Sequence, residues 1–339
     1  MAMRAIELHG FALDQLKMAE RPQPAPGPGE AVVRVRACSL NFRDWLLVQG
    51  VYNPKQKLPV IPVSDAAGDI VAVGEGVTAF KAGDRVLGHF MPTWLSGEPS
   101  VEKFSAGIGS PNDGWLCEYR SFPANALAKI PEHLSYEEAA TLPCAALTAW
   151  SAIVTLGQVK PGDRVLVQGT GGVALFALQF AKLAGAEVIV TSSSDAKLQK
   201  AKALGADHGI NYRDNPEWGR VARAISGGQG LDHIIELGGA DTLMQSIRAI
   251  RPGGMISMIG VLSGPRPEIH LPLVVMQQLR LQGITVGSKE GLDAMLRAID
   301  VSKMHPVLDR SFDFSETGVR AAYAHMGKGQ AFGKIVIVF

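Results

Sequence analysis

The feature that most constrains this chain is a strand that breaks into glycines and continues as a helix. Residues 164–168 form an apolar stretch, and the sequence Gly-Thr-Gly-Gly-Val-Ala follows directly. Apolar residues over 173–183 recur at helical spacing, and a second apolar strand is predicted over 187–191. Strand, helix and strand in this order predict a βαβ unit.

The small residues of this turn have the spacing of a dinucleotide-binding site. Gly169 would let the chain reverse sharply, Gly171 would let the backbone approach a pyrophosphate, and Ala174 would let the helix pack closely. The phosphate would face the helix N-terminus, where unpaired N–H groups favour negative charge. The complete βαβ context favours this function over a purely structural turn. The predicted cofactor-binding residues of this turn are Gly169, Gly171, Gly172 and Val173, and the last three would contact the pyrophosphate.

The end of the second strand indicates which dinucleotide binds. An acidic residue there would bond the ribose of NAD, but the chain continues as Ser192-Ser193-Ser194-Asp195-Ala196-Lys197. Hydroxyls and an ammonium suit a 2′-phosphate, because each charge-assisted hydrogen bond contributes about 1.5–3 kcal/mol. These residues favour NADPH. NADH stays possible, since Ser194 could simply cap the next helix and Asp195 could reach the ribose.

Charge and cysteine usage limit the partners and the compartment. The 339 residues carry 33 Lys and Arg against 32 Asp and Glu, which gives no electrostatic footprint for nucleic acid or an anionic membrane. No apolar run reaches transmembrane length, and the first residues begin a strand. We therefore expect a cytoplasmic protein that binds neither nucleic acid nor membrane. Cys38, Cys117 and Cys144 are widely separated, which favours reduced thiols.

Two patterns of secondary structure predict an α/β fold. Up to about Thr141, short β-type runs are interrupted by glycine and proline, which is typical of a small barrel-like β domain. From about residue 145 to 286, strands alternate with helices, which predicts a doubly wound parallel sheet. Its strands are expected over 164–168, 187–191, 208–211, 233–237, 254–260 and 281–286. The chain then has a predicted helix over 292–299 and a final strand over 334–339.

Several motifs in a fixed order resemble the medium-chain dehydrogenase/reductase superfamily along essentially the whole chain. They are Val73–Val77 with Lys81–Val86, Ala140–Trp150, the glycine turn and Ala203–Asp207. The resemblance implies a GroES-like catalytic domain over 1–145 and a Rossmann dinucleotide-binding domain over 146–286. A segment over 287–339 would return to the catalytic domain. In that superfamily the cofactor lies between the two domains.

Zinc-dependent members of the superfamily typically supply a cysteine, then a histidine followed by glutamate, then a second cysteine. The matching positions here are Asn41, Ser64-Asp65 and Cys144, so one thiol remains. Neutral oxygens suit zinc poorly, and a catalytic zinc generally needs three protein ligands. The four-cysteine structural lobe is also missing. We expect no zinc, and we expect Cys144 to be a small buried residue.

The expected reaction follows from this lack of a Lewis acid, since an alkoxide formed from an ordinary alcohol would lose its main stabiliser. Residues Ser39–Asp44 and Gly50–Tyr52 resemble the zinc-less quinone oxidoreductase branch, whose members reduce quinones or enones with NADPH. We expect hydride transfer to a quinone, an enone or a related activated carbonyl. Two alternatives stay open: an NAD(P)-dependent alcohol or aldehyde dehydrogenase, and a nucleotide-binding regulatory protein without turnover.

The same resemblance gives three catalytic candidates. Asn41 could bind cofactor or substrate through its amide, or cap a helix. Tyr52 could donate its phenol to the acceptor oxygen, or pack against the pocket wall. Asp44 could orient a neighbour, or pair with Arg43 or Lys55.

The other cofactor contacts are predicted where parallel strands end. They are Thr148 at the nicotinamide; Ser192, Ser193, Ser194 and Lys197 near the adenosine phosphate; Tyr212 beside the adenine or ribose; and Leu237, Ile259, Gly260, Val261 and Val286 at the nicotinamide end.

The loop over 90–113 would shape the substrate pocket, and its aromatic residues could form walls or pack. The outer strand over 281–286 is apolar, and the family commonly joins two such sheets, so we expect a homodimer.

Overall fold

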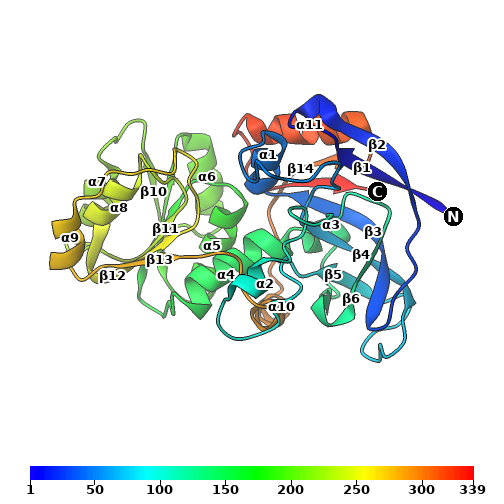
Figure 1. Ribbon diagram of the computed structural model, residues 1–339. Coiled ribbons are helices and arrows are strands. Elements are labelled where there is room, and N and C mark those ends of the chain that lie inside the picture. The colour runs from blue at the N-terminus through cyan, green and yellow to red at the C-terminus, as the bar shows by residue number, and fades with distance from the viewer. The chain divides into compact units, whose positions relative to one another are not determined.

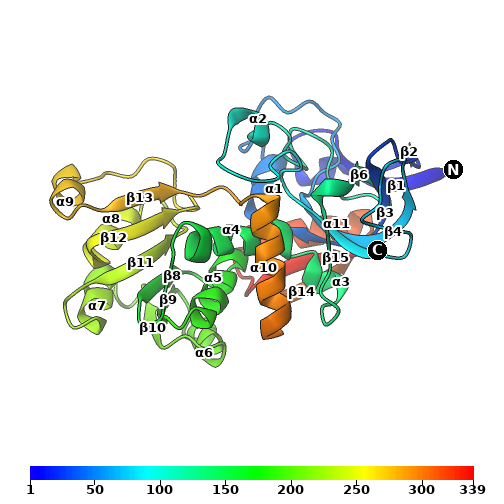
Figure 2. The ribbon, with the colours of Figure 1, turned by 90° about the horizontal axis from the view of Figure 1, so that it is seen from below.

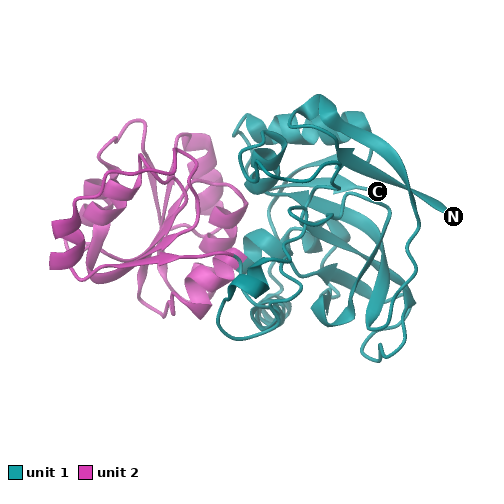
Figure 3. Cartoon of the chain, viewed as in Figure 1, with its two compact units in different colours: residues 1–147, 286–339 teal, residues 148–285 magenta.

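A computed structural model describes residues 1–339, which form two compact units. The first unit holds residues 1–147 and 286–339, and the second holds residues 148–285 (Figure 3). The chain therefore leaves the first unit once and returns to it. Each unit is described by itself below.

The second unit is built on a six-stranded sheet in the order β10-β9-β8-β11-β12-β13, and all neighbouring strands are parallel. These strands are β8 (Arg164–Gln168), β9 (Glu187–Ser192), β10 (His208–Asn211), β11 (Leu231–Glu236), β12 (Ile250–Met258) and β13 (Arg280–Gly283). The α/β fold with a doubly wound parallel sheet is thus confirmed. The strand order reverses between β8 and β11, and ligands of such sheets bind at this switch point.

Helices cover both faces of this sheet (Figures 1 and 2). They are α4 (Leu147–Trp150), α5 (Gly172–Leu183), α6 (Asp195–Ala203), α7 (Trp218–Ile225), α8 (Leu243–Ala249) and α9 (Leu271–Met276). Leu166, Ile234 and Ile256 lie side by side in the strand register and form one fully buried row. Trp218 of α7 and Ile247 of α8 belong to the same apolar cluster, so these helices bury that face.

Four predicted strands of this sheet have different bounds. The strand predicted over 187–191 extends to Ser192 as β9, and those predicted over 233–237 and 254–260 both start and end earlier in the structure, as β11 and β12. The strand predicted over 281–286 is wrong in length, because β13 ends at Gly283, whose partner Met258 is the last residue of β12. Its place at the sheet edge is confirmed, but Arg280 and Gln282 on it are exposed.

The first unit contains a two-stranded antiparallel sheet of β1 (Ala2–Leu8) and β2 (Leu16–Pro22), and a seven-stranded sheet. The larger sheet has the order β14-β15-β3-β4-β5-β7, with β6 also paired to β3. Its strands are β3 (Glu30–Leu40), β4 (Asp65–Val73), β5 (Arg85–Gly88), β6 (Tyr119–Pro123), β7 (Leu127–Lys129), β14 (Leu308–Asp313) and β15 (Lys334–Val338). The C-terminal strand β15 pairs with β3 over Ala37–Leu40, so strands from both segments of the first unit build this sheet.

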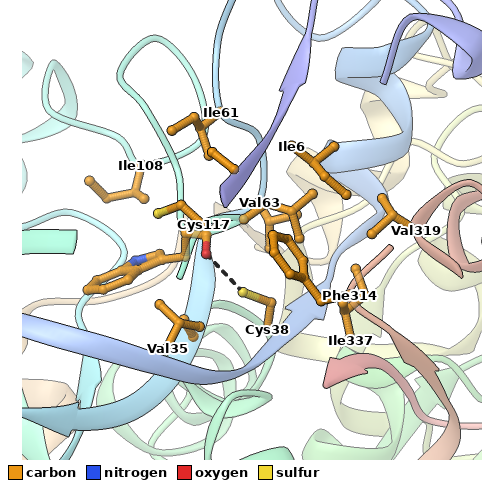
Figure 4. Packing of buried hydrophobic residues seen from close by; sticks show 14 of the residues in the cluster. Ile6, Val35, Cys38, Ile61, Val63, Ile108, Cys117, Phe314, Val319 and Ile337 are labelled. Carbon is orange, nitrogen blue, oxygen red and sulfur yellow. Dashed lines mark hydrogen bonds between the residues drawn. The ribbon is translucent and has the colours of Figure 1, made fainter. Parts of the chain in front are cut away.

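Five α-helices complete the first unit: α1 (Phe42–Val48), α2 (Val101–Phe104), α3 (Tyr136–Ala139), α10 (Lys289–Ser302) and α11 (Glu316–Gly327). Its core gathers apolar side chains from both segments of the chain, including Cys38, Val63, Phe314 and Ile337 (Figure 4). The Cys38 thiol donates to the carbonyl of Trp115 at 3.2 Å.

All three cysteines are free thiols, as predicted. Cys38 and Cys117 are buried, whereas Cys144 is partly exposed, so the prediction of a buried Cys144 is only partly met. No helix is both long and apolar enough to cross a membrane.

The aromatic residues in and directly after the predicted pocket loop pack against other rings or bond the backbone. Trp115 is 1% exposed and its ring lies 4.8 Å from that of Phe122. Trp94 meets Phe104 edge to face at 5.4 Å, and its indole N–H donates to the Gly97 carbonyl. These rings hold the loop in shape.

Candidate active site

The glycine turn of the second unit has the conformation that the sequence predicts. Gly169 has φ +76°, a left-handed backbone that favours glycine. Gly171 has φ −80° and is the N-cap of α5, where no side chain caps the helix. A Cβ at Gly171 would meet no atom of the chain within 4 Å. Neither strain nor packing within the chain requires a glycine at residue 171, so the open space and the uncapped N–H groups suit a phosphate.

The residues predicted near the adenosine phosphate lie together at the ends of β9 and β10. Ser192 is opposite Asn211 in the register, and its carbonyl accepts from the N–H of Tyr212 at 3.1 Å. The Ser194 hydroxyl caps α6 by accepting from the N–H of Lys197, which confirms the capping interpretation without excluding phosphate binding. One Asp195 oxygen accepts from the Asn211 amide at 3.0 Å. Ser193 is half-buried and Tyr212 is 42% exposed.

The loops that follow β11 and β12 bring together the residues predicted at the nicotinamide end. The N–H groups of Ile259 and Gly260 both donate to the Glu236 carbonyl, at 3.0 and 3.2 Å. A Cβ at Gly260 would lie 2.2 Å from the Leu237 carbonyl oxygen, so this close approach requires glycine. Val261, on the same loop, is exposed.

The two remaining predicted contacts lie elsewhere. Thr148 is buried in α4 of the second unit. Val286 belongs to the first unit, where it is buried and has φ +52°.

In the first unit, Asn41, Asp44, Ser64, Asp65, Cys144 and Lys334 form a buried polar cluster. Asn41 is the N-cap of α1, and its amide is engaged at both ends. Its nitrogen donates to Asp65 at 2.9 Å, and its oxygen accepts from the Lys334 ammonium at 2.5 Å. Lys334 also donates to the Leu40 carbonyl at 2.7 Å. The Asn41 side chain therefore binds other residues of the chain.

Burial and the opposite charge shift the pKa values of Asp65 and Lys334 in opposite directions. Burial raises the pKa of Asp65, while the Lys334 ammonium lowers it. Burial likewise lowers the pKa of Lys334, and Asp65 raises it. Asp65 also accepts from the Ser64 hydroxyl at 2.8 Å and from the Cys144 N–H at 3.2 Å. In both groups burial has the larger effect, so the pKa of Asp65 is raised and that of Lys334 is lowered, while the opposite charge and the hydrogen bonds of Asp65 offset part of this effect.

Asp44 is a buried residue that helps to cap the N-terminus of α1. It is fully buried, and one oxygen accepts from the Asn41 N–H at 2.8 Å, in the reciprocal arrangement of a capping box. The other oxygen lies 3.9 Å from the Arg43 guanidinium, which confirms the predicted pairing with Arg43. Burial raises the pKa of Asp44 to about 6, although Arg43 and the Asn41 N–H lower it.

Val63, directly before Ser64 of the cluster, has a strained backbone. Its φ is +74°, which a β-branched residue rarely adopts, and its side chain is fully buried (Figure 4). Such strain costs about 1–3 kcal/mol and is often found beside functional sites.

The cluster does not fit zinc, the metal of many relatives of this fold. No group of three or more His, Cys, Asp or Glu side chains could hold a metal ion. The Asn41 oxygen and the Asp65 carboxylate already accept hydrogen bonds within the cluster, and burial raises the pKa of the Cys144 thiol, which disfavours the thiolate that zinc binds.

Tyr52 lies beside this cluster, linked to it through Arg43. The guanidinium carbon of Arg43 is 4.5 Å from the Tyr52 ring centroid and 4.7 Å from that of Phe90. Arg43 also donates to the carbonyls of Ile108 and Ser110. Tyr52 itself is 44% exposed, and its side chain also shares a hydrogen bond with Arg43.

Sequence reasoning missed Lys334, which is the one charged residue of the apolar strand β15. It placed Glu236 at the end of a strand but gave its side chain no role. A charge in an otherwise apolar strand is the signal that could have identified Lys334. Its partners are far away in sequence, so no local pattern predicts the contacts.

Comparison with known proteins extends the resemblance to named relatives. Residues 172–301 match the zinc-binding dehydrogenase family, and residues 27–132 match the alcohol dehydrogenase GroES-like domain. A zinc-type alcohol dehydrogenase-like protein of Schizosaccharomyces pombe is 44% identical over 347 residues, covering 99% of each chain.

Solved structures agree with this match. One from Sinorhizobium meliloti 1021, described as an alcohol dehydrogenase, has a TM-score of 0.93 and 43% identity, covering 100% of this chain and 98% of that one. The quinone oxidoreductase of Coxiella burnetii has a TM-score of 0.81 and 26% identity, with 100% coverage of both chains. Since the similarity spans both units, this chain belongs to the medium-chain dehydrogenase/reductase superfamily and is an oxidoreductase of this NAD(P)-binding family.

Proposed function

We propose that this oxidoreductase transfers a hydride from NADPH to a quinone, an enone or a related activated carbonyl without zinc. The observation that carries the proposal is the buried polar cluster, in which the Lys334 ammonium bonds Asn41 at a position that matches a zinc ligand. An acceptor that spreads negative charge over a conjugated oxygen needs orientation and hydrogen-bond donors rather than a Lewis acid. The similarity to a quinone oxidoreductase supports this class of acceptor.

Bound NADPH would supply the hydride. In our proposal, the N–H groups at the start of α5 bind the pyrophosphate, and the open space at Gly171 admits it. Ser193 and Lys197 would bind the 2′-phosphate. Asp195 is held by Asn211, which favours NADPH over a ribose contact with NADH.

The residues of the first unit would take different roles. Tyr52 is partly exposed, and we propose that its phenol donates to the acceptor oxygen as charge develops there. The Arg43 guanidinium on its ring face would hold the phenol in place and add positive potential. Asn41 and Asp44 are occupied by internal bonds and would position α1.

The test is NADPH consumption by protein of known metal content, with a panel of quinones, enones, aldehydes and alcohols. We expect turnover of quinones or enones that a chelator leaves unchanged. Zinc-dependent oxidation of alcohols would contradict the proposal, and tight NADPH binding without turnover of any acceptor would favour a regulatory protein.

We also propose that the chain forms a homodimer through the edge of the second sheet. The edge strand β13 is unpaired on one side, and the preceding helix α9 exposes Leu271, Val275 and Met276. Light scattering that gives the mass of one chain would disprove this.

A further inference from the structure

A buried carboxylate lies at the switch point of the second sheet, and the proposed function gives this side chain no role. Glu236 is the last residue of β11, and Gln168 is the last residue of β8. These strands are neighbours, and the strand order reverses between them. Glu236 is 1% exposed and Gln168 is 6% exposed. Burial of a carboxylate is costly, so its hydrogen bonds must compensate.

Five groups donate to Glu236. One oxygen accepts from the Gln168 amide at 2.6 Å and from the Ser246 hydroxyl at 2.5 Å. The other accepts from the N–H groups of Gly238 and Gly239, both at 3.0 Å, and from the Thr242 hydroxyl. We call this arrangement the Glu236 network.

Gln168 completes the network from the other strand. Its amide oxygen accepts from the N–H groups of Leu237 and Gly238, both at 3.0 Å. Three consecutive N–H groups, 237 to 239, therefore point to two side chains at the switch point. The carbonyl groups of this loop are also bonded, since Gly238 accepts from the Ser263 N–H at 2.7 Å.

The network thereby fixes the surface that follows the strands. The loop at 237–239 contacts Gly260 so closely that no Cβ fits there. A loop whose N–H groups bond to water could shift. The N–H groups of this loop bond to buried side chains instead, which holds its backbone in one conformation. Because ligands of such sheets bind at the carboxyl ends of the strands, this loop is where a bound dinucleotide would rest.

We infer that Glu236 and Gln168 are positioning residues for the nicotinamide half of the dinucleotide, acting through the backbone of residues 237–239. The inference rests on the proposed function only in that the ligand is a dinucleotide, and it does not depend on the acceptor. The adenosine half lies at β9 and β10, which the network does not touch.

The chemistry of the network allows a swap that separates position from charge. Glu236→Gln replaces one acceptor oxygen with an NH₂ group, which then faces groups that are themselves donors. Rotating the amide of the new glutamine or of Gln168 by 180° relieves one donor–donor contact but creates another. In the double variant Glu236→Gln, Gln168→Glu, the new glutamine donates to the new glutamate. The glutamate then accepts from Leu237 and Gly238, so every donor regains an acceptor.

The experiment measures the Kd of the full chain for NADPH and for 2′,5′-ADP, which lacks the nicotinamide half. We expect Glu236→Gln to weaken NADPH binding tenfold or more and to leave 2′,5′-ADP binding within twofold. The double swap should restore NADPH binding to within threefold. Glu217→Gln is the matched control, since Glu217 is exposed and bonds Arg220 on the same unit.

Thr242→Val is a second variant, which removes one of the five donors and should weaken NADPH binding two- to fivefold. Unchanged NADPH binding in Glu236→Gln, or equal losses for both ligands, would overturn the inference. A wild-type chain that binds neither ligand would overturn the proposed function as well, whereas normal wild-type binding with an inert Glu236→Gln would overturn the inference alone.

Discussion

The two units differ in whether the polar groups of their sites are already hydrogen-bonded within the chain. In the first unit, the Asn41 amide links Lys334 to Asp65 by hydrogen bonds, so the polar atoms of this amide are already engaged within the chain. In the second unit, the glycine turn is open, with uncapped N–H groups and free space at Gly171. The comparison teaches that substitutions in the first site should change stability, while substitutions in the second should change affinity.

Lys334→Met disturbs the site of the first unit most severely. The variant leaves Asp65 buried without its cation, and the loss of one partner from a buried pair costs about 3–5 kcal/mol. Urea unfolding should show this loss. The double variant with Asp65→Asn should recover part of it, because no charge is left unpaired. Wild-type stability in Lys334→Met would contradict this cost.

Tyr52→Phe tests the partly exposed tyrosine of the first unit. The ring still stacks on Arg43, but the phenol is lost, and loss of one such donor typically lowers kcat by about 10²–10³. Steady-state kinetics should show this fall in kcat, with the KM for NADPH unchanged. Tyr119→Phe, a half-buried tyrosine on β6, is the matched control. A fall in both variants would argue for packing instead of catalysis.

Asp44→Asn sharpens the comparison through pH. The folded pKa of Asp44 is raised to about 6 from 3.8, so its stabilising contribution is complete below about pH 4 and is lost as the pH rises through 6. The asparagine variant does not titrate. Its stability relative to wild type should therefore increase by about 2 kcal/mol between pH 4 and pH 7. Urea unfolding at several pH values checks this, and a parallel pH dependence of the two proteins would contradict it.

Gly171→Ala tests the open site. The added methyl meets no atom of the chain, so the melting temperature should change by only a few degrees. It would occupy the space where we place the pyrophosphate, and NADPH affinity should fall about tenfold. Gly283→Ala on β13 is the matched control, since its Cβ is also unobstructed and it lies outside the glycine turn. Equal affinities in both variants would contradict the assigned phosphate site.

The sequence predicted correctly the features that depend on interactions between residues close together in the chain. The turn at Gly169 and the cap at Ser194 depend on residues within one βαβ unit, and both are present. The length of β13 was mispredicted because it depends on where its partner β12 ends.

The bond between Lys334 and Asn41 joins residues that are 293 positions apart. The Glu236 network similarly joins Gln168 and Glu236, which are 68 positions apart. Such contacts are set by the packed fold and leave no periodic trace in the sequence.

The central place of β15 between β14 and β3 has a consequence for biosynthesis. Residues 148–285 are continuous, so they can fold on the ribosome as soon as they emerge. The first unit must wait with an open sheet edge until residues 334–338 have been translated. Residues 1–147, which are translated first, are therefore the part of this protein most in need of a chaperone.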